Sequence, residues 1–407
     1  MAINLEVPKK YKPLITQANQ VASEVLRPIS RKYDLAEHEY PKELDMLASV
    51  IDGVNEGSDA LGGAGAAGVR GEESAASTGN KNGSNMATVL SIEEMCWGDV
   101  GLLLTMPRQG LGNSAIASVA TEEQLKKYGG KWAAMAITEP AAGSDSAAIR
   151  TTAVLDEETG EYVLNGEKIY VTSGERADLV VVWASLDLEV GRAAIKSFIV
   201  ERSNPGMKLD RLEHKLGIRA SDTAAFVLDN CRVPKDALLG NPEIDTKAGF
   251  GGVMKTFDNT RPLVAAMAIG VGRACLDETK KLLKKAGVEI DYTAPAYTQH
   301  AAAARLQQME ADWEAARLMA LHAAWMADNR EPNSVQASMA KAKAGRSCTE
   351  IALGCVELAG SLGYGEVGLL EKWARDVKIL DIFEGTQQIQ LLIIARQLLG
   401  KSSAELR

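Results

Sequence analysis

The chain has 407 residues, of which 46% are hydrophobic and 24% are charged, as is usual for a globular protein of two or three domains. Its formal net charge of -9 argues against nonspecific binding of nucleic acid, and it contains no run of about 18 apolar residues that could span a membrane. The first ten residues lack the apolar core of a signal peptide, so we expect a cytoplasmic protein.

Residues 1–131 are predicted to form an N-terminal helical domain. Apolar side chains recur at helical spacing from Leu14 and Ala18 onward. Residues 52–85 interrupt this pattern with a stretch rich in Gly, Ala, Ser and Asn, a composition that favours a mobile loop or lid. Residues 63–68 of this stretch spell GxGxxG, but no buried strand precedes them, so the motif does not indicate a dinucleotide-binding fold.

Residues 132–241 change to the period of β-strands and predict a compact antiparallel barrel or sandwich. The pair Asn165-Gly166 lies within a β-rich run and favours a type I′ turn, and therefore a β-hairpin. Further β-rich runs follow at residues 179–183, 197–200 and 225–228. Strands confined to the middle of the chain argue against a doubly wound α/β dehydrogenase.

Residues 242–407 return to helical spacing and predict a C-terminal bundle. Apolar side chains step by three or four along residues 306–324 and again along residues 351–358. Such stripes suit either a core within the chain or contacts between subunits. The chain as a whole is therefore predicted to be mainly α, with a β domain in the middle.

Neither the cysteines nor the histidines suggest a metal site. The five cysteines form no CxxC pair and are odd in number, which favours reduced thiols over a disulfide framework. Cys348 and Cys355 lie seven residues apart on an apolar helical stripe, so we expect both in the core. No two histidines have the spacing of a metal-ligand pair, and HExxH does not occur: they are His38, His214, His300 and His322. We therefore expect no metal ion.

Residues 135–146 form the first segment that suggests chemistry, at the boundary of the helical and β domains. The Thr138 hydroxyl and the turn at Gly143-Ser144 place several hydrogen-bond donors at one point, which suits the edge of a polar heterocycle or a phosphate. The alternative interpretation is a plain turn with an Asp cap.

Residues 168–174 form the second such segment. Tyr170 and Thr172 share one face of a strand end, so the ring could cover a flat ligand while the hydroxyl bonds a ring nitrogen. Alternatively, Tyr170 is an ordinary aromatic residue of the core.

Residues 257–262 form the third segment, at the start of a helical pattern. One interpretation is a structural pair between Asp258 and Arg261. The other is that this segment supports a thioester ligand, or the loop that carries Glu384.

Glu384 is the strongest candidate for a catalytic side chain. It is the only charged residue from Ile382 to Gln390, and it lies between two helical patterns. A carboxylate at such a junction can be desolvated and aimed into a cleft, as a general base for a weakly acidic C–H proton requires. A glutamate near a helix start is common in any case, because the helix dipole favours it, so the assignment depends on the other segments.

Jointly, the TEPxxGSD-like, YVTSG, FDNTRP and FEGTQQIQ motifs resemble the acyl-CoA dehydrogenase family, over about residues 90–400. The resemblance implies an N-terminal helical domain, a central antiparallel β-barrel and a C-terminal four-helix bundle, with FAD held between barrel and bundle. It implies that Glu384 removes the α-proton of an acyl-CoA thioester and that flavin N5 accepts the β-hydride. The product would be the trans-2-enoyl-CoA of fatty-acid or sterol side-chain β-oxidation, and an electron-transfer flavoprotein would reoxidise the flavin.

The resemblance also assigns the remaining residues of the site. The expected FAD contacts are Met135, Ile137, Thr138, Gly143, Ser144, Tyr170, Val171, Thr172, Thr386 and Gln388. The expected acyl-CoA contacts are Ser144, Phe257, Asp258, Arg261 and Gly385. Tyr170 stands where many members of the family carry Trp.

Two segments depart from the family pattern. Residues 284–295 lack the Arg and Phe that reach the FAD of a neighbouring subunit in homotetrameric members, and Glu357 replaces a Gln that contacts the same FAD. A carboxylate near a pyrophosphate would be unfavourable. Either the chain forms a homotetramer with rearranged FAD contacts, or a sister dehydrogenase subunit completes the site in an α2β2 heterotetramer, as in actinobacterial members of the family; we favour the sister subunit. The alternative functions are a related flavin oxidase or monooxygenase, and a non-catalytic partner subunit.

Overall fold

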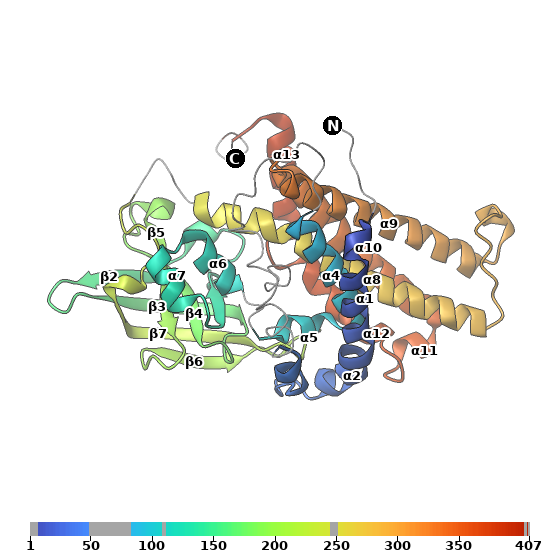
Figure 1. Cartoon of the computed structure of the whole chain (residues 1–407), viewed down its shortest axis with the longest axis horizontal. Coiled ribbons are helices and arrows are strands. Elements are labelled where there is room, and N and C mark those ends of the chain that lie inside the picture. The colour runs from blue at the N-terminus through green and yellow to red at the C-terminus, as the bar shows by residue number, and fades with distance from the viewer. Residues whose placement is uncertain (1–6, 49–82, 108–110, 245–250, 403–404, 406–407) are drawn as a thin grey trace.

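The computed structural model describes residues 7–48, 83–107, 111–244, 251–402 and 405, with only the backbone for residues 251–259. Figure 1 shows the β domain on the left and the long helices on the right. Within the described ranges, no helix has the length and apolar character needed to cross a membrane. The predicted loop at 52–85, including its GxGxxG sequence, lies outside these ranges except for residues 83–85.

The N-terminal domain is helical, as predicted. Its elements are η1 (Lys9–Tyr11), α1 (Lys12–Val21), the π-helical η2 (Ala22–Leu26), α2 (Arg27–Leu35), α4 (Ser84–Gly98), α5 (Val100–Thr105), α6 (Leu111–Val119) and α7 (Glu122–Tyr128). Local chemistry explains two of the starts. Asp99 caps α5 by accepting a hydrogen bond from the Leu102 N–H, and Thr121 forms a capping box with Gln124 at the start of α7.

The middle domain is a single curled sheet of seven strands. These are β1 (Ala133–Ala136), β2 (Thr152–Asp156), β3 (Glu161–Thr172), β4 (Leu179–Ser185), β5 (Ile195–Glu201), β6 (Met207–Leu212) and β7 (Thr223–Pro234). The strand order is β1-β4-β2-β3-β7-β6, and β5 also pairs with β4. β1 runs parallel to β4, and β2 meets β4 at one parallel pair, whereas the other pairs are antiparallel.

The prediction of an antiparallel β-barrel was wrong on closure. The path of paired strands begins at β1 and ends at β6, so the sheet forms an open half-barrel. Helix α6 packs beside β1 so closely that a Cβ on Gly112 would lie 2.3 Å from the carbonyl oxygen of Ala134. A helix that covers an edge strand protects it from pairing. The strands predicted at 179–183, 197–200 and 225–228 are confirmed as parts of β4, β5 and β7.

The predicted turn at Asn165-Gly166 was also wrong, because both residues lie inside β3. The hairpin turn instead falls between β2 and β3, where the Gly160 N–H bonds the Asp156 carbonyl and Gly160 has φ +69°. Gly166 marks a register shift in the pairing of β3 with β7. A Cβ at Gly166 would lie 2.4 Å from Thr151 Oγ1, so this glycine permits a close approach of the chain rather than a turn.

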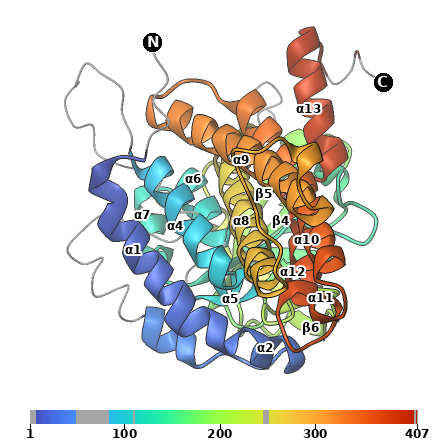
Figure 2. The ribbon, with the colours of Figure 1, turned by 90° about the vertical axis from the view of Figure 1, so that its right-hand side faces the viewer.

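The C-terminal domain is built from α8 (Gly251–Lys285), α9 (Ala301–Asp328), α10 (Ser334–Ala359), α11 (Ser361–Tyr364), α12 (Leu370–Val377), η7 (Lys378–Asp381) and α13 (Gln387–Leu399). Helices α8, α9 and α10 pack against one another, and α13 contacts α10 and extends away from the body of the domain (Figure 2). Cys348 and Cys355 are buried, as predicted.

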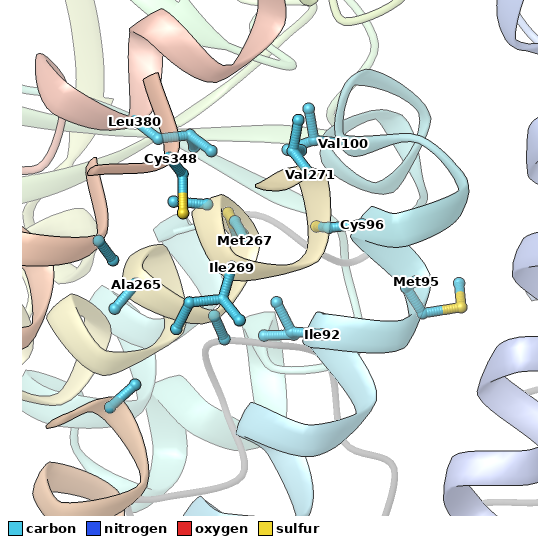
Figure 3. Packing of buried hydrophobic residues seen from close by; sticks show 14 of the residues in the cluster. Ile92, Met95, Cys96, Val100, Ala265, Met267, Ile269, Val271, Cys348 and Leu380 are labelled. Carbon is cyan, nitrogen blue, oxygen red and sulfur yellow. The ribbon is translucent and has the colours of Figure 1, made fainter. Parts of the chain in front are cut away.

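The N-terminal helix α4 packs directly on α8 and joins the two helical domains in one core. In Figure 3, Ile92 and Cys96 of α4 face Ile269 and Val271 of α8. Gly270 allows this contact, since a Cβ there would lie 2.4 Å from the Glu93 carbonyl oxygen. The helical domains therefore form a common scaffold beside the β domain.

A buried cluster of charges ties all three domains together. The Lys372 ammonium lies 2.6 Å from Asp99 and 2.5 Å from Asp376, and all three side chains are fully buried. Asp376 also accepts a hydrogen bond of 2.6 Å from the Ile218 N–H of the β domain. Burial opposes protonation of Lys372, but the two carboxylates outweigh it and raise its pKa.

Candidate functional site

The structure brings the first two predicted segments together at the end of β1 and the end of β3. The Ile169 N–H donates to the Thr138 carbonyl at 2.9 Å, and the Lys168 ammonium donates to the Ile137 carbonyl at 3.0 Å. Ile137 is buried, while Thr138 is partly exposed next to it. Met135 of β1 is partly buried against the core of the sheet. Two segments about 30 residues apart in the sequence thus form one edge of the β domain.

Tyr170 is displayed at this edge rather than packed in the core. Its side chain is 62% exposed, so the interpretation as a core aromatic is wrong. β3 has an irregular register between Lys168 and Val171, and Tyr170 within it has φ +58°. Positive φ is uncommon for a bulky residue, and bulges often re-aim side chains beside active sites. Val171 is buried, and the partly buried Thr172 pairs with Thr223 of β7.

Glu139 holds the loop that carries Gly143 and Ser144, both of which are exposed. The buried Glu139 carboxylate accepts hydrogen bonds from the N–H groups of Arg150 and Thr151, at 2.6 and 3.0 Å, and it pairs with Lys168 at 2.7 Å. Sequence reasoning assigned no role to Glu139 or Lys168. The signal for such a role was a Glu and a Lys within the two motifs. Glu139 lies in the loop after β1 and Lys168 lies in β3, and the fold brings the two side chains together.

The electrostatics of the Glu139–Lys168 pair favour its ionised form at neutral pH. Burial alone would raise the pKa of Glu139, but Lys168 and the surrounding donors lower it overall. Burial lowers the pKa of Lys168 to about 8, although Glu139 acts in the opposite direction. The buried Glu139–Lys168 pair therefore supports the exposed loop that carries Gly143 and Ser144.

Glu384 lies between η7 and α13, as predicted, and it adopts an unusual backbone conformation. Its φ is +57°, and Gly385 follows with φ +88°. The Thr260 hydroxyl donates to Glu384 Oε2 at 3.1 Å, and the Gln390 side-chain amide donates to the carbonyl oxygens of Glu384 and Gly385 at 3.2 and 3.1 Å. The carboxylate and its loop are therefore held in a defined orientation.

Burial raises the pKa of Glu384, while the Thr260 hydrogen bond, Lys341 and Arg261 lower it to a smaller extent. A raised pKa makes the carboxylate a stronger base, provided that it remains ionised at the working pH. The three opposing contacts favour the ionised form.

Lys341 is the most informative residue that sequence reasoning missed. It is fully buried on α10, and its ammonium donates to the Gly385 carbonyl at 2.5 Å. Burial lowers the pKa of Lys341 to about 8, despite the opposing effect of Asp381 and Glu384. Lys341 falls on the same apolar stripe as the buried Ala337 and Ala344, so a single lysine within that stripe was the available signal.

The remaining predicted residues lie in the segment 257–262 and in the loop around Glu384, and the structure describes some of them more fully than others. Arg261 is buried, and its charge acts on both Glu384 and Lys341. Phe257 and Asp258 lie on α8, but their side chains fall outside the described part of the chain. Thr386 caps α13 by accepting from the Ile389 N–H at 3.4 Å, and Gln388 is exposed.

The two groups of residues belong to different domains. Ile137 and Thr138 follow β1, and Tyr170 lies near the end of β3; this place, where the two strands end, is the sheet edge referred to below. Glu384 and Lys341 lie in the C-terminal helices. The residues at the sheet edge fit a flavin, since an exposed aromatic ring, a hydroxyl pair and an exposed Gly-Ser loop are what a flat heterocycle with polar edges requires.

Glu357, which departs from the family pattern, is paired within the chain. Its carboxylate lies 2.6 Å from Arg305, and both side chains are largely exposed. The Arg305 hydrogen bond and charge lower the pKa of Glu357. Arg305 therefore offsets the negative charge that would oppose a nearby pyrophosphate.

Comparisons with known proteins agree along most of the chain. Three family models match: acyl-CoA dehydrogenase N-terminal domain at residues 9–136, middle domain at 134–231 and C-terminal domain at 247–399. The caffeyl-CoA reductase–Etf complex subunit CarC of Acetobacterium woodii is 35% identical over 338 residues, which are 80% of this chain and 85% of that protein. The mitochondrial short-chain specific acyl-CoA dehydrogenase of Bos taurus is 31% identical and covers 97% of this chain and 92% of its own. The structure of butyryl-CoA dehydrogenase from Megasphaera elsdenii superimposes with a TM-score of 0.82 and 29% identity, over 98% of this chain and 100% of that one.

Proposed function

Because this chain belongs to the acyl-CoA dehydrogenase family of FAD-dependent oxidoreductases that act on CH–CH bonds, we propose that it converts an acyl-CoA thioester to the trans-2-enoyl-CoA with Glu384 as the base. The observation that carries this proposal is the Glu384 loop. Its carboxylate has a pKa raised by burial, and it is oriented by Thr260 in a segment that Lys341 and Gln390 hold in place.

The chain's own residues account for the proton transfer. A C–H beside a thioester carbonyl is weakly acidic, so Glu384 must be both basic and fixed in position. The backbone N–H of Glu384 would donate to the thioester oxygen as negative charge develops there. FAD, when bound, supplies the hydride acceptor at flavin N5. Thr138, Tyr170 and Thr172 would hold its ring system, and the reaction requires that Glu384 and the flavin both reach the Cα–Cβ bond of the substrate.

The direction of the reaction is open to a direct test. One similar protein is a subunit of a caffeyl-CoA reductase, and another is an acryloyl-CoA reductase of Anaerotignum propionicum. Reduction of an enoyl-CoA uses the same proton and hydride positions in reverse. We favour dehydrogenation in the β-oxidation of fatty acids or sterol side chains, with an electron-transfer flavoprotein as acceptor.

The test is Glu384→Gln in the flavin-loaded protein, with anaerobic stopped-flow measurement of flavin bleaching. The substrates would range from short straight-chain acyl-CoAs to CoA thioesters of steroid side chains. Loss of the base should reduce the rate by about 10²–10⁴-fold, while the flavin spectrum shows that the cofactor stays bound. The matched control is Glu350→Gln, since Glu350 is an exposed residue of α10 that pairs with Arg346.

Two outcomes would overturn parts of the proposal. Bleaching that survives in Glu384→Gln would remove Glu384 from the mechanism and favour a non-catalytic subunit. Rapid oxygen consumption by the reduced wild-type protein, without an electron-transfer flavoprotein, would favour the oxidase or monooxygenase alternative.

A second chain is proposed to complete the FAD site. Helix α13 supports this, because it carries four leucines that are 51–71% exposed: Leu391, Leu392, Leu398 and Leu399. An apolar helix face of this kind is typical of a subunit interface. The chain expressed alone should then show poor flavin retention, to be measured by flavin-to-protein ratio and light scattering. Full FAD occupancy in an active homotetramer would exclude the sister-subunit arrangement.

A further inference from the structure

Three side chains that could ligate a metal ion meet at the joint between the N-terminal helices and the β domain. Glu37 and His38 follow the end of α2, and His214 follows the end of β6, 176 residues later. One ligand atom from each of the three lies within 4.8 Å of the others. Glu37 Oε2 and His214 Nδ1 are 2.9 Å apart, and the two imidazole rings have centroids 5.0 Å apart. The expectation of no metal site rested on spacing in the sequence, which cannot detect such a group.

His38 has an unusual environment. Both of its ring nitrogens are buried and have no hydrogen-bond partner among the described residues, and its backbone has φ +73°. A buried polar group without a partner is unfavourable, because it loses its hydrogen bonds to water and gains none. A ligand that accepts an imidazole lone pair at this position would remove that cost.

The donor types select one class of ligand. Two imidazoles and one carboxylate suit Zn²⁺ and similar divalent transition metals, whereas Mg²⁺ and Ca²⁺ prefer oxygen ligands alone. We propose that Glu37, His38 and His214 form a binding site for a divalent transition-metal ion, represented by Zn²⁺, which links the N-terminal helical domain to the β domain. Glu384 and the sheet edge take no part in this site, so it is independent of the proposed dehydrogenase function.

The surroundings are compatible with a bound cation. The second carboxylate oxygen of Glu37 accepts from the Lys215 N–H at 2.9 Å, which orients the carboxylate as outer contacts usually do at metal sites. The two nearby cations have partners of their own. Arg176 pairs with Asp222 at 3.5 Å, and the Lys215 ammonium donates to the Ser221 carbonyl at 2.8 Å.

The position of the site also allows entry. His214 is 83% exposed, so an ion could reach the cluster from solvent and keep water in its remaining coordination positions. All five cysteines are buried, so thiols would not compete for added Zn²⁺ in the folded protein. An ion at this place would cross-link segments that are far apart in the sequence, and it should therefore stabilise the folded state.

The experiment is a calorimetric titration of the chelator-treated full chain with Zn²⁺, and separately with Mg²⁺. We expect one Zn²⁺ per chain, no comparable Mg²⁺ binding, and affinity at least about tenfold weaker in His38→Ala and in His214→Ala. His322→Ala is the matched control, since His322 lies on α9 beside Trp325 and away from the cluster. Zn²⁺ should also raise the melting temperature of the wild type and of His322→Ala, but not of the double variant His38→Ala/His214→Ala.

Three results would overturn the proposal. They are the absence of stoichiometric Zn²⁺ binding, binding that persists in the double variant, and equal loss of binding in His322→Ala. Melting curves without metal show whether each variant is folded, so a loss of affinity cannot be mistaken for unfolding.

Discussion

Replacement of Lys341 by Met should leave stability intact and impair catalysis, an uncommon combination for a fully buried residue. The variant keeps the length and apolar stem of the side chain and removes its charge. It also removes the hydrogen bond of 2.5 Å to the Gly385 carbonyl.

The stability effect follows from the pKa of Lys341. Burial lowers it from 10.5 to about 8, which corresponds to a cost of roughly 3 kcal/mol for keeping the ammonium charged at neutral pH. The lost hydrogen bond from a charged donor offsets about 1.5–3 kcal/mol of that gain. Lys341→Met should therefore be as stable as the wild type, or more stable by about 1 kcal/mol, in urea unfolding at pH 7.

The stability of the folded wild-type chain should depend on pH with a definite sign. Between about pH 8 and 10.5 the unfolded chain holds a proton on Lys341 that the folded chain has lost, so the stability of the wild type should rise with pH through this window. Lys341→Met should lack that rise. Lys343→Met is the matched control, because Lys343 lies on the same helix but pairs with Asp312 and is partly exposed.

The catalytic effect follows from the neighbouring carboxylate. Lys341 lowers the pKa of Glu384 against the effect of burial, so the variant should move the acid limb of the bleaching rate to higher pH. The measurement is the rate of flavin bleaching by acyl-CoA from pH 5 to 9. A variant that loses several kcal/mol of stability and keeps the wild-type pH profile would refute this reasoning.

Three further predictions concern single residues. Lys372→Met should destabilise the chain by about 3–5 kcal/mol in urea unfolding, since it leaves two buried carboxylates unpaired, whereas Lys208→Met, at an exposed pair, should cost at most about 1 kcal/mol. Gly385→Ala should cost about 1–2 kcal/mol by calorimetry, because φ is +88° and the added Cβ would lie 2.5 Å from Gln390 Nε2; its bleaching rate should fall by more than that loss explains. Tyr170→Trp should retain flavin and Tyr170→Ala should bind it more weakly in a fluorescence titration, and equal affinity of the two variants would remove the ring from the site.

Long periodic patterns were sufficient to predict the order of helical, β and helical parts. The helices over residues 306–324 and 351–358 were found because their apolar side chains repeat at the helical period and become buried. The turn at Asn165-Gly166 was misassigned because the same dipeptide serves a different purpose here. Gly166 is required by the side chain of Thr151, and no local pattern reports that contact.

The candidate site was predictable only where its residues lie in short continuous motifs. Glu384 and Tyr170 could be named in advance, whereas the contacts that orient them come from distant parts of the chain. Thr260 reaches Glu384 across 124 residues, and Lys341 reaches Gly385 across 44. The approach of His214 to Glu37 spans 177 residues, and spacing along the sequence carries no information about it.

Backbone strain occurs at three residues that the chemistry also singles out, His38, Tyr170 and Glu384. Seven non-glycine residues in the described part of the chain have positive φ, namely His38, Tyr170, Ser173, Ile218, Asn230, Arg330 and Glu384. Such a conformation costs roughly 1–2 kcal/mol per residue and persists only where the surroundings impose it. The surroundings are identifiable for Ile218, which bonds the buried Asp376, and for Glu384, which is held by Thr260 and Gln390.

A glycine would adopt the Glu384 conformation without strain, yet the chain places a carboxylate there and a glycine immediately after it. The backbone strain at Glu384 is one cost. The burial of the Glu384 carboxylate is a second, and the charge of the buried Lys341 is a third. Three separate costs at one loop are difficult to explain by folding alone, because an apolar residue at Lys341 and a glycine at Glu384 would remove them. They are consistent with a carboxylate that must be basic, ionised and fixed in direction at the same time, which is the requirement for removing a proton from carbon.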